Sequence, residues 1–265
     1  LLTFYQAFKT GEKPELVELP IQYADFAHWQ RRYVQGDVLA TQLAYWRKQL
    51  AGLPPLLALP TDRMRPAEQT FAGGKERLQL SPDLSESLKN LSLQHGVTLF
   101  MTLFSAFSVL MSRYSGQADI AIGTPVANRP HKELEDLIGF FINNLVLRID
   151  LGADPDFAAL LKQTRAVALQ AYAHQDIPFE QLVEQLNPQR SASYSPLFQV
   201  AFSLQNVPEM RASQADFALT PVDFNEGERA YSRFDLWLEF TEAPQGLMGN
   251  LEYNSDLFDE STIKR

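Results

Sequence analysis

The sequence predicts an α+β fold built in layers, and three observations predict it. Apolar residues recur at helical spacing in the first part of the 265-residue chain. From Phe198 onward they alternate with polar residues, as in strands that bury one face. One strand, helix and strand passage lies between these two parts. Helices followed by a run of strands favour an α+β domain, and we expect the late strands to be antiparallel.

Three helices are expected before residue 52. The first is under way at the start of the chain, where apolar residues lie at helical spacing: Leu1, Leu2, Tyr5 and Phe8. After a loop over residues 10–20, two further amphipathic segments cover residues 21–30 and 38–50. Residues 52–74 contain four prolines, which exclude a helix. We expect this stretch to cross between two lobes.

The next two helices have clear starts. A short strand is expected at residues 78–80, after a turn at Gly73 and Gly74. Ser81 is followed by a proline and an acid, which marks a helix start, and Thr98 caps a second helix. Because this second helix has little polar surface, we expect it to run through the core.

Strands and helices alternate in the following part of the chain. Residues 119–126 and 145–150 are predicted to be buried strands, and residues 156–174 a long helix. Pro178 starts a shorter helix that ends before Pro188. Four later strand candidates are separated by turn residues: FQVAFSLQ, DFALTPVDF, FDLWLEF and LMGNLEY.

Composition argues against several classes of partner and site. The formal net charge of −9 argues against nucleic acid, because binding a phosphate backbone needs clustered Lys and Arg. No apolar run approaches the roughly 20 residues that span a bilayer, so we expect no membrane contact and a cytoplasmic location. The chain has no cysteine, which excludes disulfides and thiolate ligands or nucleophiles.

The histidines give little sign of chemistry. The four are too far apart in sequence to form a metal-binding pair on one helix, and we expect no metal site. His174 lies close to Asp176, where a carboxylate could orient it as a general base. The structural alternative, which we favour, is that His174 and Asp176 cap adjacent helix ends. No Gly-x-Ser-x-Gly elbow supports a Ser-His-Asp triad.

Asn143 and Asn144 precede a predicted strand and have two interpretations. As turn residues, they would bond their own backbone. As functional residues, they would point an amide into a cleft at the strand end and orient an acyl or amine group, with Gly139 allowing a ligand to approach. In the second case Asn143→Ala would impair turnover more than folding. The sequence leaves both interpretations open.

Five segments, in one order, resemble a single family. They are YADFAHWQ, GTPVANRP, IGFFINNLVLR, HQDIPFEQLVEQLNPQRS and SPLFQVAFSLQN. They resemble the motifs of the condensation domains of nonribosomal peptide synthetases, and the resemblance runs nearly end to end. The family's His-His-x-x-x-Asp-Gly motif, which carries its chemistry, does not occur in the chain.

The resemblance implies a fold like that of chloramphenicol acetyltransferase, with two lobes in a V and an active-site tunnel between them. It places residues 1–70 in the end of the N-terminal lobe and the lobe crossing, and residues 71–265 in the C-terminal lobe. We then expect the chain to be a segment of a longer polypeptide whose catalytic histidine lies upstream. Alone, it would be inactive.

The implied reaction forms an amide. The α-amine of an acceptor aminoacyl thioester attacks a donor aminoacyl or peptidyl thioester, and phosphopantetheine arms of two peptidyl carrier proteins hold these substrates. The implied partners are the donor and acceptor carrier proteins and an adjacent adenylation domain, with no cofactor bound directly by the domain. The segment ANRP followed by IGFFINNLVLR is most similar to condensation domains that join two L-residues.

The resemblance also suggests site residues, none of them catalytic. Arg129 is the candidate partner of the structural Asp in the missing motif, and Arg148 competes for that role. Asn143 and Gln205 are candidates for the tunnel lining. Asp235 either faces the tunnel from a strand or bonds a turn.

Two alternatives to catalysis in a synthetase stay open. A degenerate domain of the same fold would recruit partner proteins, and loss of the upstream histidines would indicate it. A stand-alone acyltransferase would use a soluble acyl thioester, and a neighbouring carrier or adenylation module would exclude it.

Overall fold

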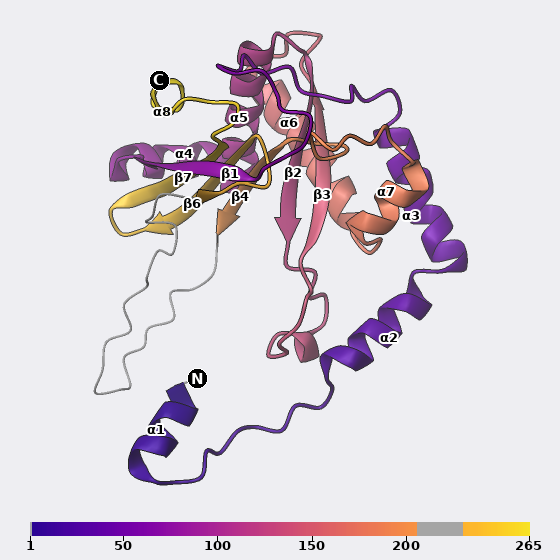
Figure 1. The fold of residues 1–265 in the computed structure, drawn as a ribbon, viewed down its shortest axis with the longest axis vertical. Helices are drawn as coiled ribbons and strands as arrows, with labels where there is room; N and C mark the ends of the chain where they lie inside the picture. The colour runs from indigo at the N-terminus through magenta and orange to yellow at the C-terminus, as the bar shows by residue number, and fades with distance from the viewer. Residues whose placement is uncertain (1, 206–229) are drawn as a thin grey trace.

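The computed structural model describes residues 2–205 and 230–265 (Figure 1). The helices of this part are α1 (Leu2–Thr10), α2 (Tyr23–Tyr33), α3 (Gly36–Gln49), α4 (Pro82–Gln94), α5 (Leu99–Ser115), a 3-10 turn (Lys132–Leu134), α6 (Phe157–Ala173), α7 (Phe179–Leu186) and α8 (Glu260–Ile263). Its strands are β1 (Ala72–Gln79), β2 (Asp119–Val126), β3 (Asn143–Asp150), β4 (Val200–Gln205), β5 (Ala230–Tyr231), β6 (Leu236–Ala243) and β7 (Gly246–Asn254).

The described strands form one seven-stranded sheet in the order β3-β2-β4-β6-β7-β1-β5. Helices packed on a sheet confirm the α+β prediction. The pairs β2–β3, β6–β7 and β1–β7 are antiparallel, but β4 runs parallel to both β2 and β6. The expectation of antiparallel late strands is therefore right for the pair β6–β7 and wrong for the pair β4–β6. An alternating pattern reports which face of a strand is buried, whereas the direction of its neighbour depends on the connection.

Helices α4, α5 and α6 pack together, and they contact strands of the sheet (Figure 1). The predicted caps are confirmed: the Ser81 hydroxyl accepts the N–H of Leu84, and the Thr98 hydroxyl accepts the N–H of Met101. Helix α5 ends at Gly116, whose φ of 69° is left-handed and therefore suits glycine. These caps satisfy backbone groups that a helix end would otherwise leave without partners.

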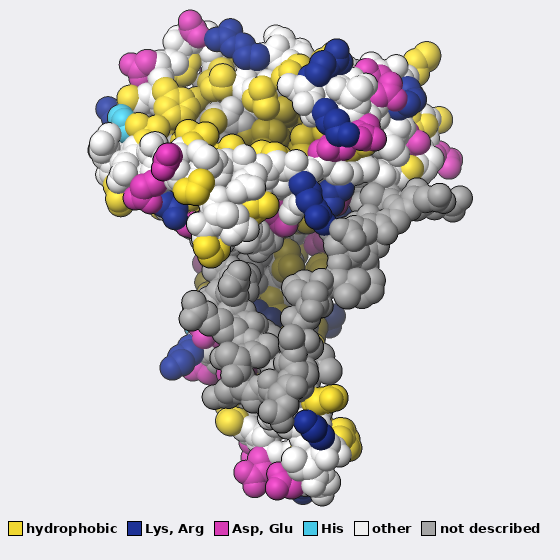
Figure 2. Space-filling view, turned by 90° about the vertical axis from the view of Figure 1, so that its left-hand side faces the viewer, with side chains coloured by type: hydrophobic (Ala, Val, Ile, Leu, Met, Phe, Trp, Pro, Cys, Tyr) yellow, Lys and Arg dark blue, Asp and Glu magenta, His cyan; other side chains and the backbone are white. Residues whose placement is uncertain are grey.

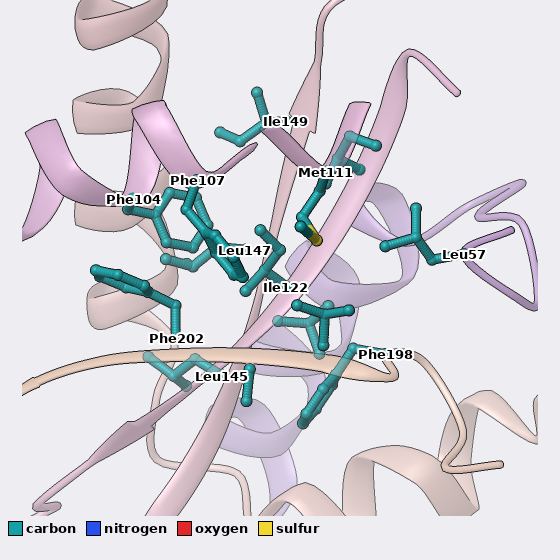
Figure 3. Packing of buried hydrophobic residues seen from close by; sticks show 14 of the residues in the cluster. Leu57, Phe104, Phe107, Met111, Ile122, Leu145, Leu147, Ile149, Phe198 and Phe202 are labelled. Atoms are coloured by element: carbon teal, nitrogen blue, oxygen red, sulfur yellow. The ribbon is translucent and has the colours of Figure 1, made fainter. Parts of the chain in front are cut away.

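The core lies between α5 and the middle of the sheet (Figure 3). The rings of Phe104 and Phe107 on α5 lie 5.9 Å and 5.7 Å from the ring of Phe202 on β4, between centroids. Ile122 and Leu147 from the neighbouring strands β2 and β3 belong to the same cluster and are fully buried. Each such side chain stabilises the fold by about 1.5–3 kcal/mol relative to leaving it exposed. Helix α5 is thus the core helix that its composition predicts.

Helix α3 belongs to this core as well. Trp46 is fully buried, and its indole N–H donates to the carbonyl oxygen of His174 at 2.8 Å. Leu43, from the same helix, and Leu57, after it, lie in the same hydrophobic cluster. The segment before residue 70 therefore packs on the main body through its second half.

Two strands begin earlier than the sequence predicts. β3 begins at Asn143, and β1 covers Ala72–Gln79, so that Gly73 and Gly74 lie inside a strand and the expected turn is wrong. A Cβ on Gly74 would come within 2.2 Å of the Tyr253 ring on β7. Close approach of a neighbouring side chain, and not a turn, is what requires glycine here. The strand expected at residues 216–224 lies outside the described residues.

The lower part of the molecule is built around α2. Phe26 of α2 packs with Leu134, Leu137 and Phe141 in a small separate cluster. Helix α1 lies further out, at the bottom of Figure 1, and exposes 78% of Phe8. Figure 2 shows a face of the upper part on which apolar side chains gather in a hollow, with charged side chains around it.

No single helix in the described ranges has both the length and the apolar character to cross a bilayer. Only α4 and α5 taken together reach them, and this pair is bent by 104° at its junction.

Candidate functional site

A large open pocket of about 1010 Å³ lies where the middle strands of the sheet meet the start of α5. Its walls come from the end of β2, the start of β3, strand β4 and the start of β6, with α7 contributing Glu180. This volume exceeds what a single amino-acid side chain needs, and suits a ligand of cofactor size.

One wall of the pocket is apolar. It is formed by Leu99, Phe100 and Met101 from the first turn of α5 and by Ile142 just before β3. Tyr172 from α6 adds a phenol, and burial raises its pKa above the ordinary value for tyrosine. The apolar composition of α5 predicts a core helix. It gives no sign that the first turn of this helix also borders a cavity.

Asn143 lines the pocket and uses its side chain to hold the loop between α6 and α7. Its Nδ2 donates to the carbonyl oxygens of Gln175 and Ile177, both at 2.9 Å. Its Oδ1 accepts the N–H of Phe179 at 2.9 Å and that of Asn144 at 3.0 Å. Asn143 is the first residue of β3 and not a turn residue. Its amide is thus committed to the backbone around the entry to α7.

Gln205 lines the same pocket, as part of a polar group that sequence reasoning missed. Its Nε2 donates to Oε2 of Glu239 at 2.9 Å, and the Ser203 hydroxyl donates to the same oxygen at 3.3 Å. The indole N–H of Trp237 donates to the Ser203 hydroxyl at 3.1 Å. Ser203, Gln205 and Trp237 border the pocket. The parallel pairing of β4 with β6 brings these residues together, and the sequence pattern does not show that pairing.

Asp235 lies apart from the pocket lining. It is 1% exposed, and its Oδ1 accepts a 2.8 Å hydrogen bond from Nη1 of Arg65, with a second bond between Nη2 and Oδ2. Burial raises the pKa of Asp235, and the guanidinium of Arg65 opposes this rise. Asp235 and Arg65 therefore form a buried ion pair, which joins the start of β6 to the segment before β1.

Arg129 caps the short turn after β2. Its guanidinium donates to the carbonyl oxygen of Leu134, to that of Glu135 at 3.2 Å and to that of Leu137 at 2.9 Å. It also lies 3.9 Å above the centre of the Phe141 ring. This site is separate from the residues that line the pocket.

Arg148, the competing candidate, also has structural partners. Its Nε and Nη2 donate to the two carboxylate oxygens of Asp119 at 2.8 Å and 2.7 Å. Its Nη1 donates to the carbonyl oxygens of Gln49 and Ala51, at the end of α3. Arg148 therefore joins α3 to β2 and β3.

His174 and Asp176 have structural neighbours. His174 ends α6, its Nδ1 lies 2.7 Å from the carbonyl oxygen of Gln170, and its ring stacks on that of Tyr45. Asp176 accepts from Nε2 of Gln42 at 3.0 Å and thus bonds α3 instead of capping α7. Burial raises the pKa of Asp176, and the charge of His174 opposes the rise. Both residues therefore join α3 to the end of α6 and the loop after it.

Of the predicted site residues, the structure therefore brings Asn143 and Gln205 to one pocket and leaves Arg129 and Asp235 elsewhere. Within residues 2–205 and 230–265, no group of three or more acids or histidines is arranged to hold a metal ion.

Comparison with known families decides the assignment. The family model described as Condensation domain matches residues 1–265, the whole chain. The chain belongs to the condensation-domain family. The motif resemblance found in the sequence is confirmed at the level of the family.

The curated relatives of this condensation-domain chain are much longer proteins. It is 53% identical over 265 residues to linear gramicidin synthase subunits C and D from Brevibacillus parabrevis, and 47% identical to malpinin synthetase from Mortierella alpina. It covers all of its own length but 3% to 5% of theirs.

Solved structures confirm the condensation-domain fold, which is the chloramphenicol acetyltransferase-like fold that the resemblance implied. The X-domain from teicoplanin biosynthesis aligns with a TM-score of 0.87 and 29% identity, over 98% of this chain and 60% of that one. A four-domain nonribosomal peptide synthetase bound to AMP and glycine aligns with a TM-score of 0.83 and 28% identity, over 95% of this chain and 20% of that one.

Proposed function

We propose that the chain forms the pocket-bearing part of a condensation domain that joins two carrier-bound thioesters through an amide. The observation that carries this proposal is that Asn143 and Gln205, taken from two separate family motifs, border one cavity. The cavity volume of about 1010 Å³ suits an aminoacyl group on a pantetheine arm.

The proposed reaction depends on how the two thioester substrates are positioned, and it uses no cofactor bound by the domain. The acceptor amine nitrogen attacks the donor thioester carbonyl, a C–N bond forms, the C–S bond breaks, and the amine proton goes to the departing thiolate. Holding the two reactants side by side supplies a large part of the rate enhancement. The His-His-x-x-x-Asp-Gly motif is absent from the sequence, so we assign no catalytic residue among residues 1–265.

The proposal includes the partners and the setting. Substrates arrive on the phosphopantetheine arms of donor and acceptor peptidyl carrier proteins, next to an adenylation domain, in the cytoplasm, and both joined residues are L-configured. The resemblance divides the lobes between residues 70 and 71. Because Trp46 is buried in the main cluster, α3 packs with the later part of the chain, and we propose a division before α3 instead.

The experiment uses the intact domain, which is this chain together with the upstream segment that carries the double histidine in the family. The domain is mixed with loaded donor and acceptor carrier proteins, and the acceptor is analysed by mass spectrometry. The proposal expects a donor–acceptor amide on the acceptor arm. No product with native carriers would refute it, and an acceptor with an acetylated α-amine serves as the negative control.

A second candidate function is recruitment of a partner protein without condensation. The observation that favours it is the likeness to the structure titled complex of the X-domain and OxyB from teicoplanin biosynthesis, with a TM-score of 0.85 and 29% identity. An altered upstream histidine motif together with a stable complex with a partner enzyme would support it. Amide formation in the assay above would exclude it as the sole function.

A further inference from the structure

A polar group lies beside the pocket, on the face of the sheet opposite the Phe202 core. Strands β4 and β6 run parallel, with Ser203 opposite Glu239. Side chains alternate along a strand, so Ser203, Gln205 and Glu239 share a face, whereas Phe202 and Phe240 belong to the buried core. The hydrogen bonds from Ser203 and Gln205 to Glu239 confirm that these three side chains meet.

Both donors to the Glu239 carboxylate among the described residues are neutral, a hydroxyl and an amide. Two other acids of this region have cationic neighbours: Glu242 pairs with Lys89 at 2.6 Å, and the charge of Lys75 acts on Glu252. Glu180 and Arg233 also line the pocket. The negative charge of Glu239 reaches beyond its own partners, since it adds to the burial that raises the pKa of Glu252. A carboxylate held by neutral donors next to a largely apolar cavity attracts cations into it.

The hydrogen bonds to Glu239 also fix the orientation of the Gln205 amide and the Ser203 hydroxyl in the pocket wall. Because Gln205 donates its Nε2 to Glu239, its Oε1 is kept as an acceptor. Ser203 is held between Trp237 and Glu239, so its hydroxyl has a single orientation. The wall therefore offers acceptor oxygens backed by a carboxylate, which is the chemistry that binds an ammonium group.

We infer that Glu239 is a positioning residue for the acceptor substrate: with Ser203 and Gln205, it draws the α-ammonium of the aminoacyl thioester to this wall of the pocket. This inference rests on the proposed function. The ammonium releases one proton to solvent before the neutral nitrogen attacks, and the role of Glu239 ends with binding and orientation.

The test measures recognition of the amine separately from catalysis. Two stable amide analogues are titrated into the intact domain by calorimetry: leucyl-aminopantetheine, which has a free α-amine, and its des-amino counterpart. We expect the wild type to bind the amine analogue about tenfold more tightly, the size expected of one charge-assisted hydrogen bond. In Glu239→Gln the two dissociation constants should become nearly equal.

The matched control is Glu86→Gln, which removes the same charge from the exposed surface of α4 and should keep the tenfold preference. Circular dichroism and thermal unfolding establish that both variants fold. Equal affinities in the wild type, an unchanged preference in Glu239→Gln, or no binding of either analogue would overturn the inference. Condensation itself is scored separately, so product formation with an unchanged preference refutes this role for Glu239 and leaves the proposed function standing.

Discussion

Arg65 and Asp235 form a buried ion pair between segments that are 170 positions apart in the sequence. Arg65 lies in the stretch between α3 and β1, and Asp235 lies just before β6. Nη1 of Arg65 also donates to the carbonyl oxygen of Ser193 at 3.3 Å. It fixes the long connection across the end of the sheet.

Removing Arg65 should destabilise the protein strongly, because Arg65→Ala leaves the carboxylate of Asp235 buried without its counter-ion. We expect a loss of about 3–5 kcal/mol in the free energy of unfolding, measured by urea denaturation. Arg63→Ala is the matched control, since Arg63 pairs with Asp259 at the exposed surface and should contribute at most about 1 kcal/mol. Equal effects of the two changes would contradict the buried-pair interpretation.

The sequence contains one half of this relationship. Alternation in FDLWLEF predicts a strand and places Asp235 opposite its apolar face, and four prolines correctly exclude a helix from the stretch that holds Arg65. Their meeting depends on the path of a long connection, for which periodicity carries no signal. Helix caps were predictable because both partners lie close together in the sequence. The hydroxyls of Ser81 and Thr98 accept from N–H groups three residues further along the chain.

Asn143 should contribute to stability through its four hydrogen bonds. Asn143→Ala leaves the carbonyl oxygens of Gln175 and Ile177 and the N–H of Phe179 without this partner, and we expect a loss of about 2 kcal/mol. Asn143→Asp should cost more, because it places a carboxylate oxygen against two carbonyl oxygens.

A residue that acted on turnover alone would not change the free energy of unfolding when replaced. Asn144→Ala is the comparison for Asn143→Ala, and we expect it to lower the free energy of unfolding by less than about 1 kcal/mol. An unfolding midpoint in Asn143→Ala equal to that of the wild type, with reduced condensation, would show instead that its main role is in the reaction.

Arg129 should hold the turn after β2 in place. A lysine offers one ammonium where the guanidinium reaches three carbonyl oxygens and stacks on Phe141. In Arg129→Lys we expect amide hydrogen exchange in residues 132–137 to accelerate about tenfold, as local opening becomes easier. Arg113→Lys, on the exposed side of α5, should leave this exchange unchanged. Slow exchange retained in Arg129→Lys would argue against this capping role.

Asp176 should make stability depend on pH. Because burial raises its pKa in the folded state, the folded protein holds a proton that the unfolded chain has released, and stability falls as pH rises through the folded pKa. Asp176→Asn removes this cost while leaving an oxygen that can accept from Gln42. The melting temperature of the variant minus that of the wild type should therefore be larger at pH 7 than at pH 4. A difference that is constant or larger at pH 4 would contradict the assignment.

The candidate site was predictable only in part. Motifs indicated Asn143 and Gln205, which do line the pocket, because both lie in segments that resemble family motifs. Glu239 and Ser203 carried no signal of their own, since their meeting requires β4 to lie parallel to β6. The bond from Gln42 to Asp176 joins positions 134 apart, again through tertiary packing that no sequence period encodes.

The most direct test of the account compares the 265-residue chain with the intact domain in one condensation assay, using identical loaded carrier proteins and mass spectrometry of the acceptor arm. In the proposed function, this chain builds the pocket, and the family's double-histidine motif supplies the catalytic histidine. We therefore expect the amide product from the intact domain and none from the 265-residue chain above the no-enzyme background. Product formed by the 265-residue chain alone would contradict it.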